Sequence, residues 1–122
     1  MVMLDTNMIL RYLLNDNEEM AERTEKYLCA GNVMVTTEVI AEVVYVLLGV
    51  YRLEREKIAG TVEGFLKMVS AGDKEVLNLA VVTFGSRNLD FVDCVLYAYH
   101  KLRGIEVATF DKKLLKLMEQ DQ

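Results

Sequence analysis

Short apolar runs alternate with stretches of helical periodicity along the first half of the chain. The apolar residues 2–4 stop at Asp5, and apolar residues at helical spacing follow, which predicts a strand, a loop and a helix. A charged surface helix is expected over 17–30, followed by a short strand over 33–35 and an apolar helix over 38–48. The chain therefore begins by repeating a strand-to-helix unit.

The second half continues this alternation with weaker signals. The pattern predicts, in order, a helix over 54–69, a weak strand at 76–77, a short helix over 79–84, a helix over 91–102, a strand over 105–109 and a last helix with Leu114, Leu115, Leu117 and Met118. Strands that alternate with helices favour an α/β fold with a parallel sheet covered on both faces. Ligands bind such sheets beyond the carboxyl ends of the strands, so polar residues there are the first candidates.

A single domain is expected over residues 1–122, because this length suits one hydrophobic core and no low-complexity linker interrupts it. Hydrophobic residues make up 52% of the chain and charged residues 27%, which is a globular composition. The longest apolar stretch, 43–50, is far shorter than the roughly 20 residues that a membrane helix needs. We therefore expect a cytoplasmic protein, in which Cys29 and Cys94 are reduced residues of the core.

The net charge of −5 bears on the binding surface. Phosphate binding depends mainly on Lys and Arg, so an acidic chain argues against a protein that grips nucleic acid through a large basic surface. A site that gathers carboxylates around metal ions adds negative charge and agrees with this balance. The basic residues available to phosphates, all of which could equally form a solvated face, are Arg11, Arg52, Arg55, Arg87, Lys101, Arg103, Lys112 and Lys113.

Two aspartates lie at the expected carboxyl ends of strands. Asp5 follows the first strand immediately, and Asp111 comes two residues after Thr109 at the end of the last one. Aspartate also begins turns and caps helices, which is the structural alternative for each of them. Their shared position makes them candidates for one site.

Glu42 and Asp93 are isolated charges in apolar helical stretches. Glu42 is the only charged residue between Val39 and Tyr51, and Asp93 is the only one in 91–98. A helix that is apolar nearly all round is expected to be buried, where an unpaired carboxylate is costly. We therefore expect Glu42 to be buried with a partner or a metal ion, whereas Asp93 could alternatively compensate the dipole of its helix.

Two further acids are possible secondary members of the site. Glu38 lies one helical turn before Glu42, and Asp90 lies three residues before Asp93, so each can share a face with its neighbour. Compensation of the helix dipole is the structural alternative for both.

Acids from two strand ends and two helix starts could converge on one cleft. Close carboxylates tolerate each other only with cations between them, and oxygen ligands suit Mg²⁺ or Mn²⁺. Such ions, singly or as a pair roughly 4 Å apart, activate water and stabilise the leaving oxygen in phosphodiester hydrolysis. Other chemistry has little support, because His100 is the only histidine and no Ser-His or Cys-His pair, P-loop or dinucleotide-binding glycine motif occurs.

Four segments, taken in order, resemble the motifs of the PIN-domain family and particularly of VapC-type toxin ribonucleases. These segments are Met3-Leu4-Asp5-Thr6-Asn7, residues 37–47 around Glu42, residues 89–96 around Asp93, and Ala108-Thr109-Phe110-Asp111. The resemblance spans nearly the whole chain, and the ordered set is more specific than any one motif.

The resemblance implies a three-layer α/β/α sandwich around a central parallel sheet. It implies metal binding and catalysis by Asp5, Glu42, Asp93 and Asp111, with supporting hydrogen bonds from Thr6, Asn7 and Thr109. It further implies a metal-dependent endoribonuclease that acts on RNA as a homodimer. Such a protein would be the toxin of a type II pair, blocked by a small antitoxin protein.

Three alternatives stay open. A non-catalytic PIN-like module that binds RNA or protein would keep the fold without the chemistry. A receiver-type signalling domain needs an acceptor aspartate after a strand near mid-chain, and residues 48–73 offer none. A haloacid-dehalogenase-like phosphatase needs a second aspartate two residues after the first, where Asn7 stands.

Overall fold

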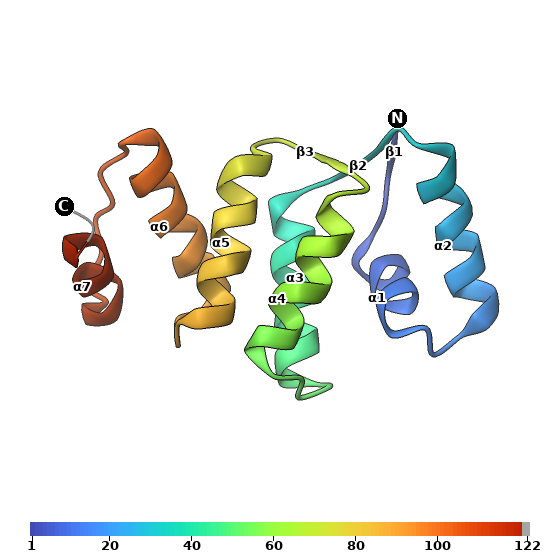
Figure 1. The fold of residues 1–122 in the computed structure, drawn as a ribbon, viewed down its shortest axis with the longest axis horizontal. Coiled ribbons are helices and arrows are strands. Elements are labelled where there is room, and N and C mark those ends of the chain that lie inside the picture. The colour runs from blue at the N-terminus through green and yellow to red at the C-terminus, as the bar shows by residue number, and fades with distance from the viewer. Residues whose placement is uncertain (121–122) are drawn as a thin grey trace.

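The computed structural model describes residues 1–120, in which three strands alternate with seven helices (Figure 1). In chain order these are β1 (Val2–Met3), α1 (Thr6–Leu14), α2 (Glu18–Ala30), β2 (Val33–Val35), α3 (Thr37–Gly49), α4 (Arg55–Leu66), β3 (Ser70–Ala71), α5 (Lys74–Ser86), α6 (Phe91–Arg103) and α7 (Lys112–Gln120). The helices stand side by side in a row from α2 at one end to α7 at the other, so the molecule is longer than it is wide (Figure 1).

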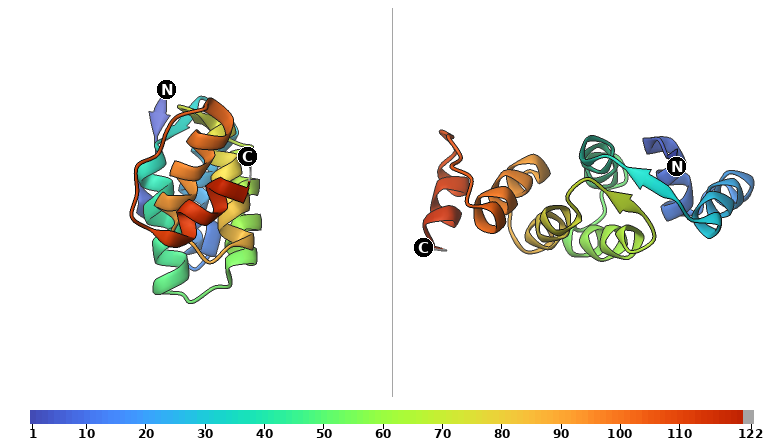
Figure 2. Two further views of the ribbon diagram at one scale, coloured as in Figure 1. Left: turned by 90° about the vertical axis from the view of Figure 1, so that its left-hand side faces the viewer. Right: turned by 90° about the horizontal axis from the view of Figure 1, so that it is seen from above.

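The strands form one parallel sheet in the order β1-β2-β3. Val2 lies opposite Val33, and Met34 lies opposite Ser70. Seen from above, α3 and α4 lie on opposite sides of the strands (Figure 2). The predicted α/β fold, with a parallel sheet flanked by helices, is confirmed.

Polar side chains fix where four of the helices begin. Asp5, Asn17, Thr36 and Asp73 each accept a hydrogen bond from the backbone N–H three residues later, at the starts of α1, α2, α3 and α5. Such caps satisfy N–H groups that have no partner within the helix. Asp5 lies two residues after the end of β1 and Thr36 directly follows β2, so each cap starts a helix where an extended run stops.

The predicted weak strand at 76–77 is wrong. Val76 and Leu77 are buried in the first turn of α5, and the third strand lies earlier, at Ser70–Ala71. The N-cap Asp73 explains why a helix forms here instead of a strand. The Val76 N–H donates to Asp73 Oδ1 at 3.2 Å, and this hydrogen bond starts α5. For the same reason the short helix expected over 79–84 is part of the longer α5.

The predicted strand over 105–109 is not formed within the described part of the chain. These residues connect α6 to α7 as an extended segment with no strand beside them. Because α6 packs on α5, away from β1, the segment lies far from the sheet (Figure 1). His100 Nδ1 lies 2.9 Å from the carbonyl oxygen of Ile105, which makes this histidine part of the turn that leaves α6.

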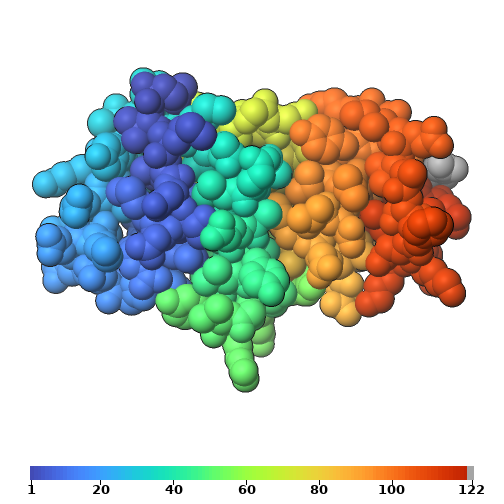
Figure 3. Space-filling view, turned by 180° about the vertical axis from the view of Figure 1, so that it is seen from behind, coloured from blue at the N-terminus to red at the C-terminus, as the bar shows by residue number. Residues whose placement is uncertain are grey.

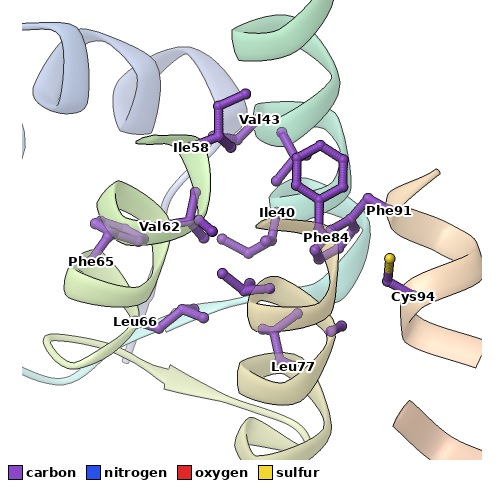
Figure 4. Packing of buried hydrophobic residues seen from close by; sticks show 14 of the residues in the cluster. Ile40, Val43, Ile58, Val62, Phe65, Leu66, Leu77, Phe84, Phe91 and Cys94 are labelled. Carbon is purple, nitrogen blue, oxygen red and sulfur yellow. The ribbon is translucent and has the colours of Figure 1, made fainter. Parts of the chain in front are cut away.

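The hydrophobic core joins α3, α4 and α5 and extends to the start of α6 (Figure 4). Ile40, Val62 and Phe84 are buried there, and Phe84 meets Phe91 of α6 edge to face with ring centroids 6.0 Å apart. Cys94 is buried as expected, whereas the burial expected for Cys29 is wrong, because α2 turns this thiol to solvent. Within residues 1–120, none of the helices has both the length and the hydrophobicity that spanning a bilayer requires.

Candidate metal centre

Asp5 lies where the sequence places it, just beyond β1 and at the cap position of α1. Its Oδ1 accepts a hydrogen bond from the Met8 N–H at 2.9 Å, and the side chain is exposed. Thr6 and Asn7 follow in the first turn of α1, with Thr6 half-buried and Asn7 exposed. The cap holds one carboxylate oxygen against the helix, so the exposed Asp5 can offer the other to a ligand.

Glu42 is exposed, so the expectation that it is buried is wrong. Ile40, Val43 and Leu47 pack into the core, while Glu38, Glu42 and Tyr45 form a stripe on the opposite face of α3, with Tyr45 75% exposed. An exposed carboxylate keeps its hydration and needs no partner. Glu42 is therefore a candidate metal ligand because of its position in the chain, and not because burial makes its charge costly.

Asp93 is half-buried in the first turn of α6, and its pKa is raised. The largest cause is burial, which disfavours the charged form, followed by repulsion from Asp111 and from Asp90. Asp90 stands at the cap position of α6, and its side chain makes no capping hydrogen bond. Asp90 and Asp111 are thus each near enough to Asp93 to act on its carboxylate.

Asp111 is oriented by its own neighbours. Its backbone N–H donates to Thr109 Oγ1 at 3.0 Å, and its Oδ1 accepts from the Leu114 N–H at 2.9 Å. Both bonds belong to the turn that starts α7, with Asp111 directly before the helix. Thr109 therefore positions Asp111 through its backbone.

One hollow of about 370 Å³ brings the C-terminal acids together with basic residues. Its lining residues are Arg55, Asn88, Leu89, Asp90, Asp93, Asp111, Lys112 and Lys113. A second hollow, of about 230 Å³, shares Asn88, Leu89 and Lys113 with it and adds Arg87, Lys116, Leu117 and Gln120. Carboxylates and amines thus stand side by side, an arrangement that suits a cation and a phosphate at neighbouring points.

Arg55, which the sequence offered only as one of several basic residues available to phosphates, has a specific structural place beside this hollow. Its guanidinium donates to the carbonyl oxygens of Phe84, Arg87 and Leu89 at 3.3, 2.8 and 2.7 Å and lies 4.2 Å above the Phe84 ring. These contacts tie the start of α4 to the loop before α6. No local pattern could reveal them, because every acceptor is distant in sequence.

The predicted acids fall into two groups. Asp90, Asp93 and Asp111 line one hollow, whereas Asp5, Glu38 and Glu42 are on α1 and α3 and do not line it. Within residues 1–120, no set of three Asp, Glu, His or Cys side chains is close enough to hold a metal ion. A single chain in this arrangement does not bring all the predicted ligands together.

The chemistry of the donors nevertheless suits a divalent metal ion. Carboxylate oxygens are the ligands that Mg²⁺ and Mn²⁺ prefer. Burial is the largest cause of the raised pKa of Asp93, and repulsion from Asp111 and Asp90 adds to it, so a cation near these carboxylates would favour the ionised form. The donor types therefore fit the ion, while the arrangement of one chain does not complete its coordination.

Comparison with known proteins agrees with the predicted family. A family model described as PIN domain matches residues 2–119. The chain is similar to a VapC ribonuclease of Aquifex aeolicus (strain VF5), with 32% identity over 125 residues that cover 96% of this chain and 92% of that protein. No solved structure matches.

Proposed function

The chain belongs to the PIN domain family, and from this premise we propose that it is a metal-dependent endoribonuclease that hydrolyses phosphodiester bonds of RNA. The observation that carries the proposal is the hollow in which Asp90, Asp93 and Asp111 adjoin Lys112 and Lys113. The similar VapC protein is described as a ribonuclease, which gives RNA as the substrate class to test.

The proposed roles follow from the positions of the acids. Asp5, Glu42, Asp93 and Asp111 would hold Mg²⁺ or Mn²⁺, Glu38 and Asp90 would be secondary acids, and Thr6, Asn7 and Thr109 would orient the ligands. The bound ion would supply activation of water and stabilisation of the leaving oxygen. The chain's own contribution is to fix the carboxylates, as the Thr109 and Leu114 hydrogen bonds do for Asp111.

The lysines of α7 would position the RNA backbone. Lys112 and Lys113 line the same hollow as the acids, and Lys116 lines the adjoining one. On the opposite side of α7, Leu114, Leu117 and Met118 are buried. An exposed row of amines beside carboxylates would hold phosphates next to the reacting one and would offset the acidic charge of the chain.

We propose further that the protein is the toxin of a type II toxin-antitoxin pair, with a small antitoxin protein as its partner. This part of the proposal rests on the similarity to VapC and on the order of the four motifs. An assay in which a co-expressed candidate antitoxin suppresses cleavage by the purified complex would test it.

The ribonuclease proposal is tested by cleavage of a mixed single-stranded RNA pool with Mg²⁺ or Mn²⁺, with EDTA as the metal-free control. Asp5→Asn and Glu42→Gln should abolish cutting, whereas Glu63→Gln, at an exposed position of α4, should leave it unchanged. Cutting that persists in EDTA or survives both site variants would contradict the proposal.

A non-catalytic binding module is the second candidate. It is favoured by one observation, namely that residues 1–120 of a single chain form no three-donor metal cluster. The same RNA pool separates the two candidates, because a binding module would retain RNA in a gel-shift assay without shortening it.

A further inference from the structure

A hollow of about 250 Å³ lies between α3 and the start of α6. Figure 3 shows the face on which the teal to green residues of α3 meet the orange residues around the start of α6. The lining is mainly aromatic and aliphatic, in contrast to the polar hollow that holds the C-terminal acids. Its apolar members include Tyr45 and Leu48 of α3, Phe84 of α5, and Phe91 and Val92 of α6.

Tyr45 is an exposed aromatic side chain without a partner. It is 75% exposed, and among residues 1–120 its ring contacts no other aromatic ring and its hydroxyl has no hydrogen-bond partner. Val92, which also lines the hollow, is 59% exposed, whereas Phe84 and Phe91 are buried. Water therefore contacts apolar surface that a flat ring could cover instead.

The charged members of the lining are two carboxylates, Asp90 and Asp93. Asp90 is exposed at the cap position of α6, and its side chain makes no capping hydrogen bond. Its oxygens are therefore available to a ligand, and an ionised carboxylate accepts hydrogen bonds but donates none. A ligand with a flat apolar face and N–H donors along one edge matches both parts of the hollow.

The same two aspartates also line the hollow that contains Asp111, Lys112 and Lys113. The two hollows are thus neighbours that share a wall. In a nucleotide the base is joined to its phosphate through one sugar, so a phosphate beside the lysines would bring a base within reach of the apolar hollow. Bases of single-stranded RNA are free to turn outward and stack on aromatic side chains.

We propose that the hollow between α3 and α6 binds one unpaired base of the RNA substrate, stacked on Tyr45 and hydrogen-bonded along its edge to Asp90. This inference rests on the proposed function, because it takes RNA as the substrate class. Cytosine, adenine and guanine each carry an amino group that donates to a carboxylate, whereas uracil has none and would turn carbonyl oxygens toward Asp90. The site therefore favours bases with an amino group over uracil.

A single base fits this hollow better than a helix of another protein. The hollow is smaller than the roughly 300–1,000 Å³ of pockets that take drug-sized ligands. An apolar helix laid over it would also remove water from Asp90 and Asp93 without supplying N–H donors, which is costly for carboxylates. A base supplies an apolar face for Tyr45 and donors for Asp90 in one group.

A fluorescent reporter at Tyr45 tests the stacking. The chain contains no tryptophan, so Tyr45→Trp introduces a single one at an exposed position. In EDTA, which keeps the RNA intact, octacytidine should quench this tryptophan at a concentration about tenfold lower than octauridine does. The matched control is Tyr27→Trp, at an exposed position of α2, which neither RNA should quench.

Asp90→Asn tests the choice of base. An asparagine side chain both donates and accepts, so the ratio of the two dissociation constants should fall from about ten to near one. The ratio cancels any general gain in RNA affinity from the lost negative charge. Glu63→Gln removes one negative charge from an exposed position of α4 and should leave the ratio unchanged.

Variants that carry no reporter test the native ring. Tyr45→Phe should bind labelled octacytidine as the wild type does, and Tyr45→Ala about tenfold more weakly, as measured by fluorescence anisotropy. Because the side chain is exposed, both variants should melt at the wild-type temperature. Weaker binding with an unchanged melting temperature therefore reports the loss of stacking and not a loss of fold.

Three results would overturn the base site: equal quenching of both tryptophan variants, an Asp90→Asn ratio equal to that of the wild type, or unchanged binding by Tyr45→Ala. Quenching by a basic amphipathic peptide but by neither RNA would make the hollow a protein-binding surface instead. If the wild type cleaves no RNA while octacytidine still quenches Tyr45→Trp selectively, the ribonuclease proposal fails and the base site stands. If RNA is cleaved without such quenching, the base site alone fails.

Discussion

Asp93 is partly withdrawn from water. Burial in the first turn of α6 raises its pKa, and Asp111 and Asp90 raise it further. The carboxyl group therefore takes up a proton more readily than a free aspartate does. A cation between these side chains would favour the ionised form, so metal binding and ionisation of Asp93 should support each other.

Asp73, which caps α5 and lies beside the C-terminal end of α6, has a lowered pKa. Arg103 donates to its two carboxylate oxygens at 2.9 and 3.1 Å and to Glu75 at 2.7 Å. The Arg103 hydrogen bonds, followed by the cap to Val76, lower the pKa of Asp73 from its ordinary value of 3.8. A lowered pKa in the fold gives stability that is present above the unfolded pKa and disappears as pH falls through the folded pKa.

Asp73→Asn keeps a capping side chain and removes only the charge. We expect this variant to melt below the wild type at neutral pH, with the gap in Tm shrinking as pH falls below about 4. Thermal unfolding followed by circular dichroism across this pH range measures the gap. If the difference in Tm stays constant or grows as pH falls, the ion pair between Asp73 and Arg103 is not its cause.

The exposed face of α3 explains why the burial of Glu42 could not be predicted from the sequence. Tyr45 shares that face, and its hydroxyl suits a position in water although its ring is apolar. Because tyrosine fits either a buried or an exposed position, the sequence does not reveal one solvent-facing stripe in an otherwise apolar helix. The position of Asp5 after β1 could be predicted, because it depends only on where an apolar run stops.

At the scale of elements, α4 and α5 approach each other closely at Gly85. A Cβ at this position would lie 2.6 Å from the Cβ of Ala59. Real side chains do not come so near, so the two helices would have to separate. The close approach of α4 and α5 holds Arg55, at the start of α4, near the loop before α6 to which it donates hydrogen bonds.

Gly85→Ala should therefore destabilise the protein by about 1–3 kcal/mol through overpacking. Gly64→Ala is the matched control, since it lies in α4 with open space around the added Cβ, and it should stabilise by up to ~1 kcal/mol. Urea unfolding measures whether the free energy of unfolding of each variant is lower or higher than that of the wild type. Equal effects would show that helix propensity, not the contact with Ala59, decides the outcome at Gly85.

Elements with strong periodicity could be predicted and short apolar pairs could not. The helices over 37–49 and 91–103 agree with their sequence patterns to within a residue or two at each end. At 76–77, two apolar residues fit a strand or a buried helix equally well, and only the Asp73 cap separates the two. At 105–109 the pattern describes a strand, but a sequence cannot say whether a neighbouring strand is present to pair with it.

The whole molecule is a row of helices with acids at two places along it. Along the row of helices, the group on α1 and α3 lies nearer the α2 end and the group on α6 and α7 lies toward the other end (Figure 1). The motifs could be predicted to form one site, because order and spacing are visible in the sequence. Their division between two regions could not, because it depends on how α6 packs on α5.

The most direct test of the central claim is the rate at which the protein cleaves one fluorescent single-stranded RNA in Mg²⁺. The wild type should cut only with the metal ion present, and Asp93→Asn should slow cutting on the order of 100-fold or more, because it removes charge at the metal. Glu63→Gln should cut at the wild-type rate. Equal rates for Asp93→Asn and the wild type, or cutting that continues in EDTA, would contradict a carboxylate-held metal as the source of activity.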